Sequence, residues 1–465
     1  MLKKLTFAVC LLLLVPAFVL AAEVPKELDA YLALPDDSYR WEILEKPQRP
    51  TGTATYVVEL TSQTWQGIVW KHYMLLVVPA NLVSRDHAVL VIEGSNNGDK
   101  PGDMHKMIAG MAGGQAGMPM ALLLQVPNQP LLGKDGNRGY VEDALIGETF
   151  LKAVETKDAT WPLLFPMAKS AIRAMDAIQE ILKQERKLDI KGFIVGGASK
   201  RGWTTWLTAA SGDKRVTAIV PMVIDNLNTG KQMEYQLETW GEYSASINDY
   251  VERDLLRNDN TPRSEFEKEL WTMIDPYSYR SRLAMPKLLM HGANDPYWTV
   301  DATKWYFHDL PGPKYLLTVP NAGHGLGLES GGNQAELMRA GMRLATSIAV
   351  FAKHAALGGD WPTFEWTLSE SDAGYQINID TELPLRETVN QDGVKLSSGV
   401  KLWTAESETK DFRQAKWTST DQKGSLSITV PKPKSGHIAF FVEIESRNND
   451  ENPRPFSLTT QVWRY

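Results

Sequence analysis

Between residues 87 and 319 the chain alternates short apolar runs with helical patterns, and this alternation constrains its fold more than any other feature. The apolar runs are read as strands at 87–93, 120–126, 193–195, 216–224, 287–291 and 315–319, preceded by strands at 55–61 and 72–79. Pro166–Lys187 is the clearest helix, because its apolar residues recur at three- and four-residue steps. Strands that alternate with helices indicate a mainly parallel sheet covered on both faces. The sequence therefore predicts an α/β fold.

Two segments depart from this alternation. Residues 229–280 are rich in aromatic and charged residues at helical spacing, and we interpret them as a helical cap inserted over the edge of the sheet. After Leu357 the composition changes to short alternating segments separated by turn residues, which suit a small all-β sandwich. We therefore predict an α/β domain at 23–357, with its cap at 229–280, and a β-sandwich domain at 358–465.

The first 22 residues are typical of a secretory signal peptide. Lys3 and Lys4 precede an apolar run of about 16 residues, and Ala21-Ala22 closes it with small side chains. We expect cleavage there, which removes the single cysteine, Cys10. It also lowers Lys+Arg from 49 to 47 against 56 acidic residues, so the net charge changes from −7 to −9. The predicted location is secreted or periplasmic, with no membrane span after cleavage because no other stretch is long and apolar enough.

Composition narrows the function classes. A pI of about 5.7 argues against nucleic acid as a partner. One cysteine excludes a disulfide framework and a multi-cysteine zinc site, and no metal-binding motif is present. The glycines of Gly110–Gly117 do not match a dinucleotide-binding fingerprint and are better read as tight helix–strand packing. We expect no metal and no cofactor, and the sequence does not indicate an oligomeric state.

The run Ile194–Trp203 carries the clearest chemical signal. An apolar strand meets Gly197-Ala198-Ser199 and then enters a helix, as in a nucleophile elbow, where small neighbours permit a strained turn at the serine. Arg201 stands where the usual pattern has glycine, and Gly202 follows it. Taken alone, this departure leaves open that Ser199 merely caps the helix.

Candidate partners follow in the order of a Ser–Asp–His triad. Asp295 lies after the buried strand 287–291, and His324 lies on a glycine-flanked loop after the strand 315–319. We predict Ser199 as nucleophile, His324 as base and Asp295 as acid, with Asp225 as an alternative acid. His291 is read as structural.

Further residues are predicted around the triad. The amide of Lys200 is the expected oxyanion donor, and the loop 93–98 supplies a second, with Ser95 as best candidate. Arg201, Trp203 and Trp298 are candidate substrate contacts. Salt bridging by Lys200 and Arg201, and core packing by the tryptophans, remain the alternatives.

At these residues the sequence resembles the PhoPQ-activated pathogenicity-related family of secreted bacterial proteins. The resemblance rests on the elbow 197–203, on Val223–Asn228 and on His291–Asp295, and it runs over nearly the whole mature chain. It implies an α/β-hydrolase fold with Ser199, Asp295 and His324 as the triad. The elbow also looks like that of glucuronoyl esterases, and His-Gly-x-x-Asp is shared with prolyl-oligopeptidase-like peptidases.

Together these features predict a secreted serine hydrolase that cleaves an ester or amide through an acyl-serine intermediate. A small-molecule, saccharide-ester or peptide substrate fits the site, with a slight preference for esters. The alternatives are a secreted peptidase of prolyl-oligopeptidase-like type and a non-catalytic binding or signalling protein that keeps the fold.

Overall fold

The structure is a computed structural model, and it describes residues 23–47, 52–133, 139–259, 261–329, 333–389, 395–447 and 455–465. The predicted signal peptide, residues 1–22, lies outside the described residues, and its cleavage stays a prediction.

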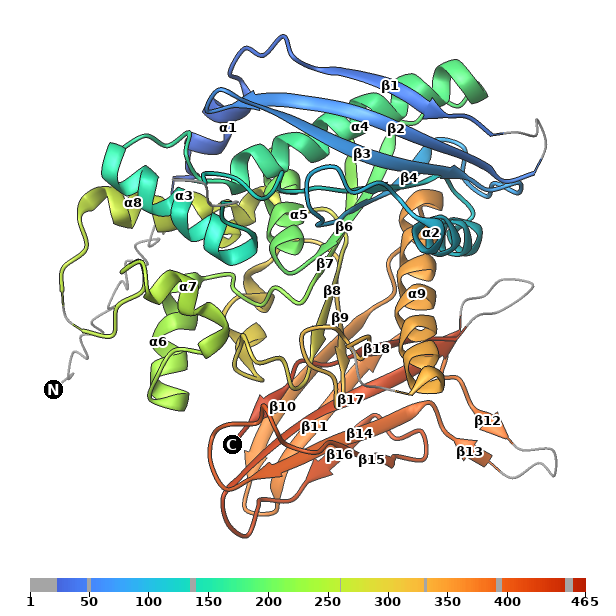
Figure 1. The fold of residues 1–465 in the computed structure, drawn as a ribbon. Coiled ribbons are helices and arrows are strands. Elements are labelled where there is room, and N and C mark those ends of the chain that lie inside the picture. The colour runs from blue at the N-terminus through green and yellow to red at the C-terminus, as the bar shows by residue number, and fades with distance from the viewer. Residues whose placement is uncertain are drawn as a thin grey trace, which may run out of the picture.

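A large twisted sheet forms the centre of the molecule (Figure 1). Its first nine strands are β1 (Arg40–Glu45), β2 (Ala54–Trp65), β3 (Ile68–Val78), β4 (His87–Ile92), β5 (Met120–Leu123), β6 (Gly192–Ala198), β7 (Val216–Met222), β8 (Lys287–Gly292) and β9 (Lys314–Val319). They lie in the order β1-β2-β3-β5-β4-β6-β7-β8-β9. The first three pairings are antiparallel, and every pairing from β5 to β9 is parallel. The predicted α/β fold is confirmed, but the sheet is mixed: its central pairings are parallel, and those toward both ends of the strand order are antiparallel.

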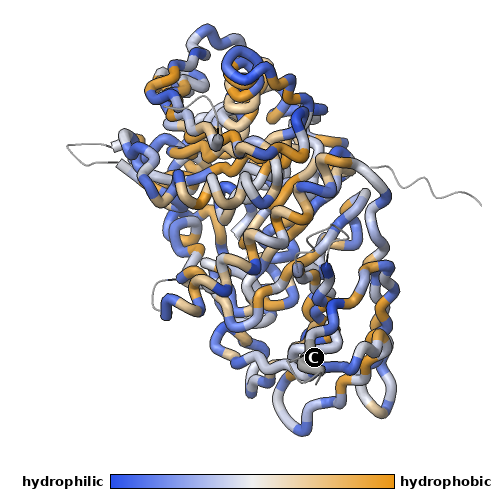
Figure 2. Tube along the Cα trace, turned by 90° about the vertical axis from the view of Figure 1, so that its right-hand side faces the viewer, coloured by the Kyte–Doolittle hydropathy of each residue, from blue (hydrophilic) through white to orange (hydrophobic). Residues whose placement is uncertain are grey.

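Helices cover both faces of this sheet. On one face lie α3 (Glu142–Thr156), α4 (Leu164–Arg186) and α5 (Lys200–Ala210), and on the other lie α2 (Asp103–Ala116) and α9 (Gln334–Leu357) (Figure 1). Strand β4 shows why both faces need cover: Leu90 and Ile92 belong to the core under α4 and α5, whereas Val89 belongs to the core on the opposite face. Figure 2 shows hydrophobic and hydrophilic residues alternating along the elements, as layers with buried sides require.

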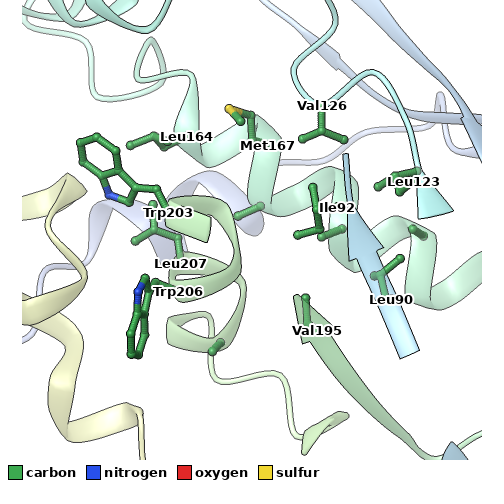
Figure 3. Close-up of a cluster of buried hydrophobic side chains, with 14 of the residues drawn as sticks. Leu90, Ile92, Leu123, Val126, Leu164, Met167, Val195, Trp203, Trp206 and Leu207 are labelled. Atoms are coloured by element: carbon green, nitrogen blue, oxygen red, sulfur yellow. The ribbon is translucent and has the colours of Figure 1, made fainter. Parts of the chain in front are cut away.

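The core beneath α4 and α5 supports the segment that carries Ser199. Figure 3 shows Leu90 and Ile92 facing Val195 of β6 and the side chains of α4 and α5, including Met167 and Leu207. Each large aliphatic side chain buried here contributes about 1.5–3 kcal/mol. Strand β6 and helix α5 are therefore held firmly on both sides of the turn between them.

Shorter helices stand between β7 and β8, where the cap is predicted. They are α6 (Thr229–Trp240), η1 (Ala245–Ile247), α7 (Asn248–Val251), α8 (Glu265–Ile274) and η2 (Pro276–Arg282). Helix α1 (Glu27–Leu32) precedes the sheet, and η3 (Ala302–Trp305) and η4 (Phe307–Asp309) precede β9. The helical content of this insertion agrees with the sequence, while its role as a cap stays a prediction.

After α9 the described chain is built of strands. They are β10 (Phe364–Ser371), β11 (Gly374–Thr381), β12 (Thr388–Val389), β13 (Lys395–Ser397), β14 (Val400–Ser407), β15 (Thr418–Asp421), β16 (Ser427–Val430), β17 (His437–Arg447), β18 (Pro455–Thr459) and β19 (Trp463–Arg464). Strands β10, β11 and β16 form a small sheet that packs on β17, with the rings of Tyr375 and Phe440 5.5 Å apart.

A separate β-sandwich domain at 358–465 is not confirmed. Strand β18 pairs with β9 through Thr459 and Leu316, so the order continues as β9-β18-β17-β14-β15 within one sheet. The Thr318 amide also donates to the Thr459 hydroxyl at 2.9 Å. Without β18, strand β9 would present unpaired backbone groups at an open edge, and this pairing covers them.

Candidate active site

Ser199 stands at a sharp turn between β6 and α5. Its backbone has φ 56° and ψ −125°, a conformation that costs a non-glycine residue about 1–3 kcal/mol. Two hydrogen bonds hold the turn: the Ser199 amide donates to the Met222 carbonyl at 2.8 Å, and the Trp203 amide donates to the Ser199 carbonyl at 3.0 Å. Ser199 is half-buried beside exposed Ala198, so its hydroxyl is presented at the carboxyl edge of the sheet.

Two glycines explain how this turn tolerates Arg201. A Cβ on Gly197 would lie 2.6 Å from the Arg201 carbonyl oxygen. A Cβ on Gly202 would lie 2.6 Å from Ile224 and 2.9 Å from the Met222 carbonyl oxygen. Gly202 therefore permits the close helix–strand contact, and position 201 is free to carry a side chain.

The structure brings the three predicted triad residues into one hydrogen-bonded chain. His324 Nε2 lies 2.8 Å from Ser199 Oγ, and His324 Nδ1 lies 2.8 Å from Asp295 Oδ2. The Asp295 side chain is 6% exposed and that of His324 is 26% exposed, so the acid is buried while the base reaches solvent.

The loops that carry Asp295 and His324 pack tightly together. Asp295 follows β8 and His324 follows β9, and a Cβ on Gly292 would lie 2.2 Å from the Gly323 carbonyl oxygen. The amide of Tyr297 donates to Asp295 Oδ1 at 2.9 Å, which leaves Oδ2 to face the imidazole. Backbone contacts therefore set the separation of acid and base.

The segment between β14 and β15 also holds these two loops. Asn294 Nδ2 donates to the Ala415 carbonyl at 2.8 Å and to the Phe412 carbonyl at 3.1 Å. Asn321 and Trp417 exchange two hydrogen bonds, of 2.8 and 3.0 Å. One asparagine thus precedes Asp295 directly, and the other lies three residues before His324.

The alternative acid, Asp225, lies apart from this chain. It is buried, with Oδ2 4.0 Å from His291 Nδ1. Burial raises the pKa of Asp225 to about 8, a hydrogen bond from Tyr306 opposes the rise, and the charges of Asp295 and Asp301 add to it. The raised pKa favours the neutral acid form of Asp225, which does not suit a carboxylate that steadies an imidazolium.

His291 is enclosed beside Asp225, consistent with a structural role. Its Nε2 lies 3.5 Å from the Tyr306 hydroxyl, and burial lowers the pKa of its imidazole to about 4.

The side chains of Lys200 and Arg201 turn away from the serine into ion pairs with the start of α3. Lys200 Nζ lies 2.7 Å from Asp143 Oδ2, and Arg201 binds both oxygens of Glu142, at 2.6 and 2.7 Å. Burial alone would raise the pKa of Glu142. The hydrogen bonds and the charge of Arg201 outweigh this effect, so the pKa falls from 4.5 to about 2. Both cations are thus neutralised, which favours the salt-bridge reading over direct contact with substrate.

The remaining predicted residues lie as follows. The loop 93–98 touches the elbow, because a Cβ on Gly94 would lie 2.2 Å from Arg201 Nη2. Ser95 Oγ is buried without a hydrogen-bond partner in the described part of the chain.

Of the two candidate tryptophans, Trp203 is 5% exposed and donates to the Ile274 carbonyl at 2.7 Å, so packing explains it better than substrate contact. Trp298 is half-buried, 6.2 Å from the ring of Tyr297.

Three residues beside the site were not predicted from the sequence: Tyr297, Asp143 and Glu142. Tyr297 stacks on His324 with ring centroids 4.1 Å apart, and Asp143 binds Lys200. For Tyr297 a local signal existed, because an amide two residues after an aspartate commonly bonds to its carboxylate. Asp143 gave no such signal, because the residues that it contacts are 57 to 154 positions away in the chain.

Fold and site define an α/β protein with a Ser–His–Asp chain at the carboxyl edge of its sheet. The profile of the PhoPQ-activated pathogenicity-related protein family matches residues 28–413, and the chain belongs to that family. The chain is 32% identical to the autocrine proliferation repressor protein A of Dictyostelium discoideum over 483 residues, covering 97% of this chain and 93% of that protein.

Solved structures with a related arrangement are more distant. An acetyl xylan esterase from a Paenibacillus species shares 15% identity with a TM-score of 0.48, covering 69% of this chain and 92% of that one. A second acetyl xylan esterase, from a Thermoanaerobacterium species, shares 16% identity with a TM-score of 0.45, covering 72% and 95%. Among the residues that the structure describes, no helix is long and apolar enough to cross a bilayer.

Proposed function

We propose that this protein is a secreted or periplasmic serine hydrolase of the α/β-hydrolase type, with Ser199, His324 and Asp295 as its triad. The observation that carries the proposal is the chain of two 2.8 Å contacts from Asp295 through His324 to a serine held on a strained strand-to-helix turn. A serine that merely capped a helix would need neither the strain nor the aligned imidazole.

The chemistry follows from these positions. His324 Nε2 takes the proton of Ser199 as Oγ attacks the acyl carbon, and Asp295 holds the Nδ1 proton and stabilises the imidazolium. His324 then protonates the departing alcohol or amine. Water, deprotonated by the same nitrogen, attacks the acyl carbon; the bond to Ser199 Oγ breaks, His324 returns the proton to Oγ, and the acid is released.

Two groups are proposed to bind the oxyanion. The amide of Lys200 stands at the N-terminus of α5, where backbone N–H groups carry partial positive charge. The second donor is assigned to Ser95, on the loop packed against Arg201. The buried, unpartnered hydroxyl of Ser95 supports this choice.

The substrate is proposed to be an ester or amide of a small molecule, a saccharide or a peptide, with a preference for esters. The site supports a substrate larger than its acyl group, because Ala198 is exposed and Ser199 and His324 are only half-buried. The test is reaction with a fluorophosphonate probe. Wild type and Ser211→Ala, a control serine at the end of α5, should be labelled, and Ser199→Ala should not. Equal labelling of Ser199→Ala would contradict the proposal.

A second candidate function is non-catalytic signalling on a retained fold. It is favoured by the name of the Dictyostelium relative, a proliferation repressor, which shares 32% identity. This candidate predicts a folded protein with no probe labelling and no turnover across esters, aminoacyl amides and uronate esters.

A further inference from the structure

Tyr297 contacts both the proposed base and the proposed acid. Its ring stacks on the imidazole of His324, with centroids 4.1 Å apart and planes inclined by 27°. Its backbone amide donates to Asp295 Oδ1 at 2.9 Å. A single residue therefore limits how the imidazole can tilt and how the carboxylate can rotate.

The far end of the tyrosine ring is tied to a buried carboxylate. The Tyr297 hydroxyl donates to Asp143 Oδ2 at 3.3 Å, and the same oxygen accepts from Lys200 Nζ at 2.7 Å. The other oxygen, Oδ1, accepts from the Tyr250 hydroxyl at 3.0 Å. Asp143 thus connects the residue after the nucleophile with the ring that covers the base.

Charge and protonation suit this arrangement. The Asp143 side chain is 11% exposed and that of Lys200 is 9% exposed, so the ion pair acts in a medium that screens it weakly. Burial, reinforced by the charge of Asp143, raises the pKa of both Tyr297 and Tyr250. Both phenols therefore keep their protons as donors to Asp143.

We propose that Tyr297 is a positioning residue: its ring holds the imidazole of His324 in line with Ser199 and Asp295, and Asp143 sets the orientation of that ring. The expected change in rate rests on the proposed function. The position of the His324 imidazole can be measured whether or not the protein turns over a substrate. Misplacement of a reacting group by about 1 Å costs on the order of 100-fold in rate. The ring is the only side chain described here as stacked on His324.

The test compares Tyr297→Phe, which keeps the ring and loses the bond to Asp143, with Tyr297→Leu, which loses the ring. Tyr243→Phe is the matched control, because its hydroxyl donates to the Arg257 carbonyl in the predicted cap. Two readouts are used: the rate of fluorophosphonate labelling, and the proton NMR signal of His324 Nδ1–H. The NMR readout reports the bond to Asp295 and needs no turnover.

We expect labelling to slow about 3–10-fold in Tyr297→Phe and about 30–100-fold in Tyr297→Leu, with no effect in Tyr243→Phe. The Nδ1–H signal should persist in Tyr297→Phe and broaden or vanish in Tyr297→Leu. If Tyr297→Leu does not fold, the slowing in Tyr297→Phe decides.

An unchanged Nδ1–H signal in folded Tyr297→Leu overturns the positioning role, whatever the labelling rate. Absence of labelling in wild type would instead overturn the proposed function, and the NMR comparison would still decide the role of Tyr297.

Discussion

At the scale of single residues, the site depends on which carboxylate serves the base. Asp295 Oδ2 meets His324 Nδ1 at 2.8 Å, whereas Asp225 contacts His291 and Tyr306. We expect Asp295→Asn to lower kcat by about 10³–10⁴-fold, because an amide fails to hold the correct tautomer. Asp225→Asn should keep activity within a few-fold. The measurement is steady-state kinetics on one chromogenic ester, with Tm as the folding control. If Asp225 is the acid, Asp225→Asn will lose more activity than Asp295→Asn.

Asp225 also makes stability depend on pH. Its pKa is raised from 3.8 to about 8, so between these values the folded state holds a proton that the unfolded state has released. The free energy of unfolding therefore falls as pH rises, by up to about 1.4 kcal/mol per unit. His291, with its pKa lowered to about 4, acts in the opposite direction below about pH 6.5.

The clean comparison is the difference between wild type and Asp225→Asn, because the histidines and Lys287, whose pKa burial lowers to about 7, titrate in both proteins. Between pH 6.5 and 8, urea denaturation should show wild type losing stability, whereas Asp225→Asn should lose clearly less. Parallel curves for the two proteins would mean that Asp225 is already ionised in the folded state.

Much of the site was predictable from local patterns. Small residues around Ser199, a strand before Asp295 and glycines beside His324 are all readable within a few positions, because turns at strand ends impose local steric demands. The partners of Lys200 and Arg201 were not readable, because Asp143 and Glu142 approach them only through tertiary packing.

At the scale of elements, the turn between β6 and α5 requires glycine at two positions, Gly197 and Gly202, where the backbones approach too closely for a side chain. We expect Gly202→Ala to destabilise the protein by about 1–3 kcal/mol, because its Cβ meets Ile224 at 2.6 Å and the backbone of Met222 at 2.9 Å. The shift of α5 should also displace Ser199 and slow probe labelling.

Gly230→Ala is the control for that substitution. Gly230 lies in α6, and a Cβ there meets nothing within 4 Å. Thermal unfolding and labelling rate are the measurements. A Gly202→Ala protein with native Tm and native labelling would show that the helix–strand contact is not limiting.

Strand positions were predicted more accurately than strand partners. The apolar run 315–319 matches β9 closely, but nothing near it indicates that Leu316 pairs with Thr459. The alternation of apolar and polar residues indicates which face of a strand is buried. It does not indicate which strand, more than 100 residues away, pairs with its edge. For this reason the sequence suggested a separate sandwich where the sheet continues.

At the scale of the whole molecule, the C-terminal strands complete the site as well as the sheet. Strand β18 covers the edge of β9, and the segment between β14 and β15 binds Asn294 and Asn321 on the loops that carry Asp295 and His324. We expect residues 23–357 expressed alone to aggregate or to unfold far below the wild-type Tm, since an open strand and a large apolar face become exposed.

Solubility, Tm and probe labelling of that fragment measure this dependence. A soluble fragment with native Tm and labelling would contradict it and would restore the view of two separable domains.

The central claim is that Ser199 is a nucleophile activated by His324. Its most direct measurement is peptide mapping by mass spectrometry after exposure of the wild-type protein to a fluorophosphonate. We predict one adduct per chain, on the peptide that contains Ser199, and none in His324→Ala. A folded wild-type protein that carries no adduct, or carries it on another residue, would contradict the account.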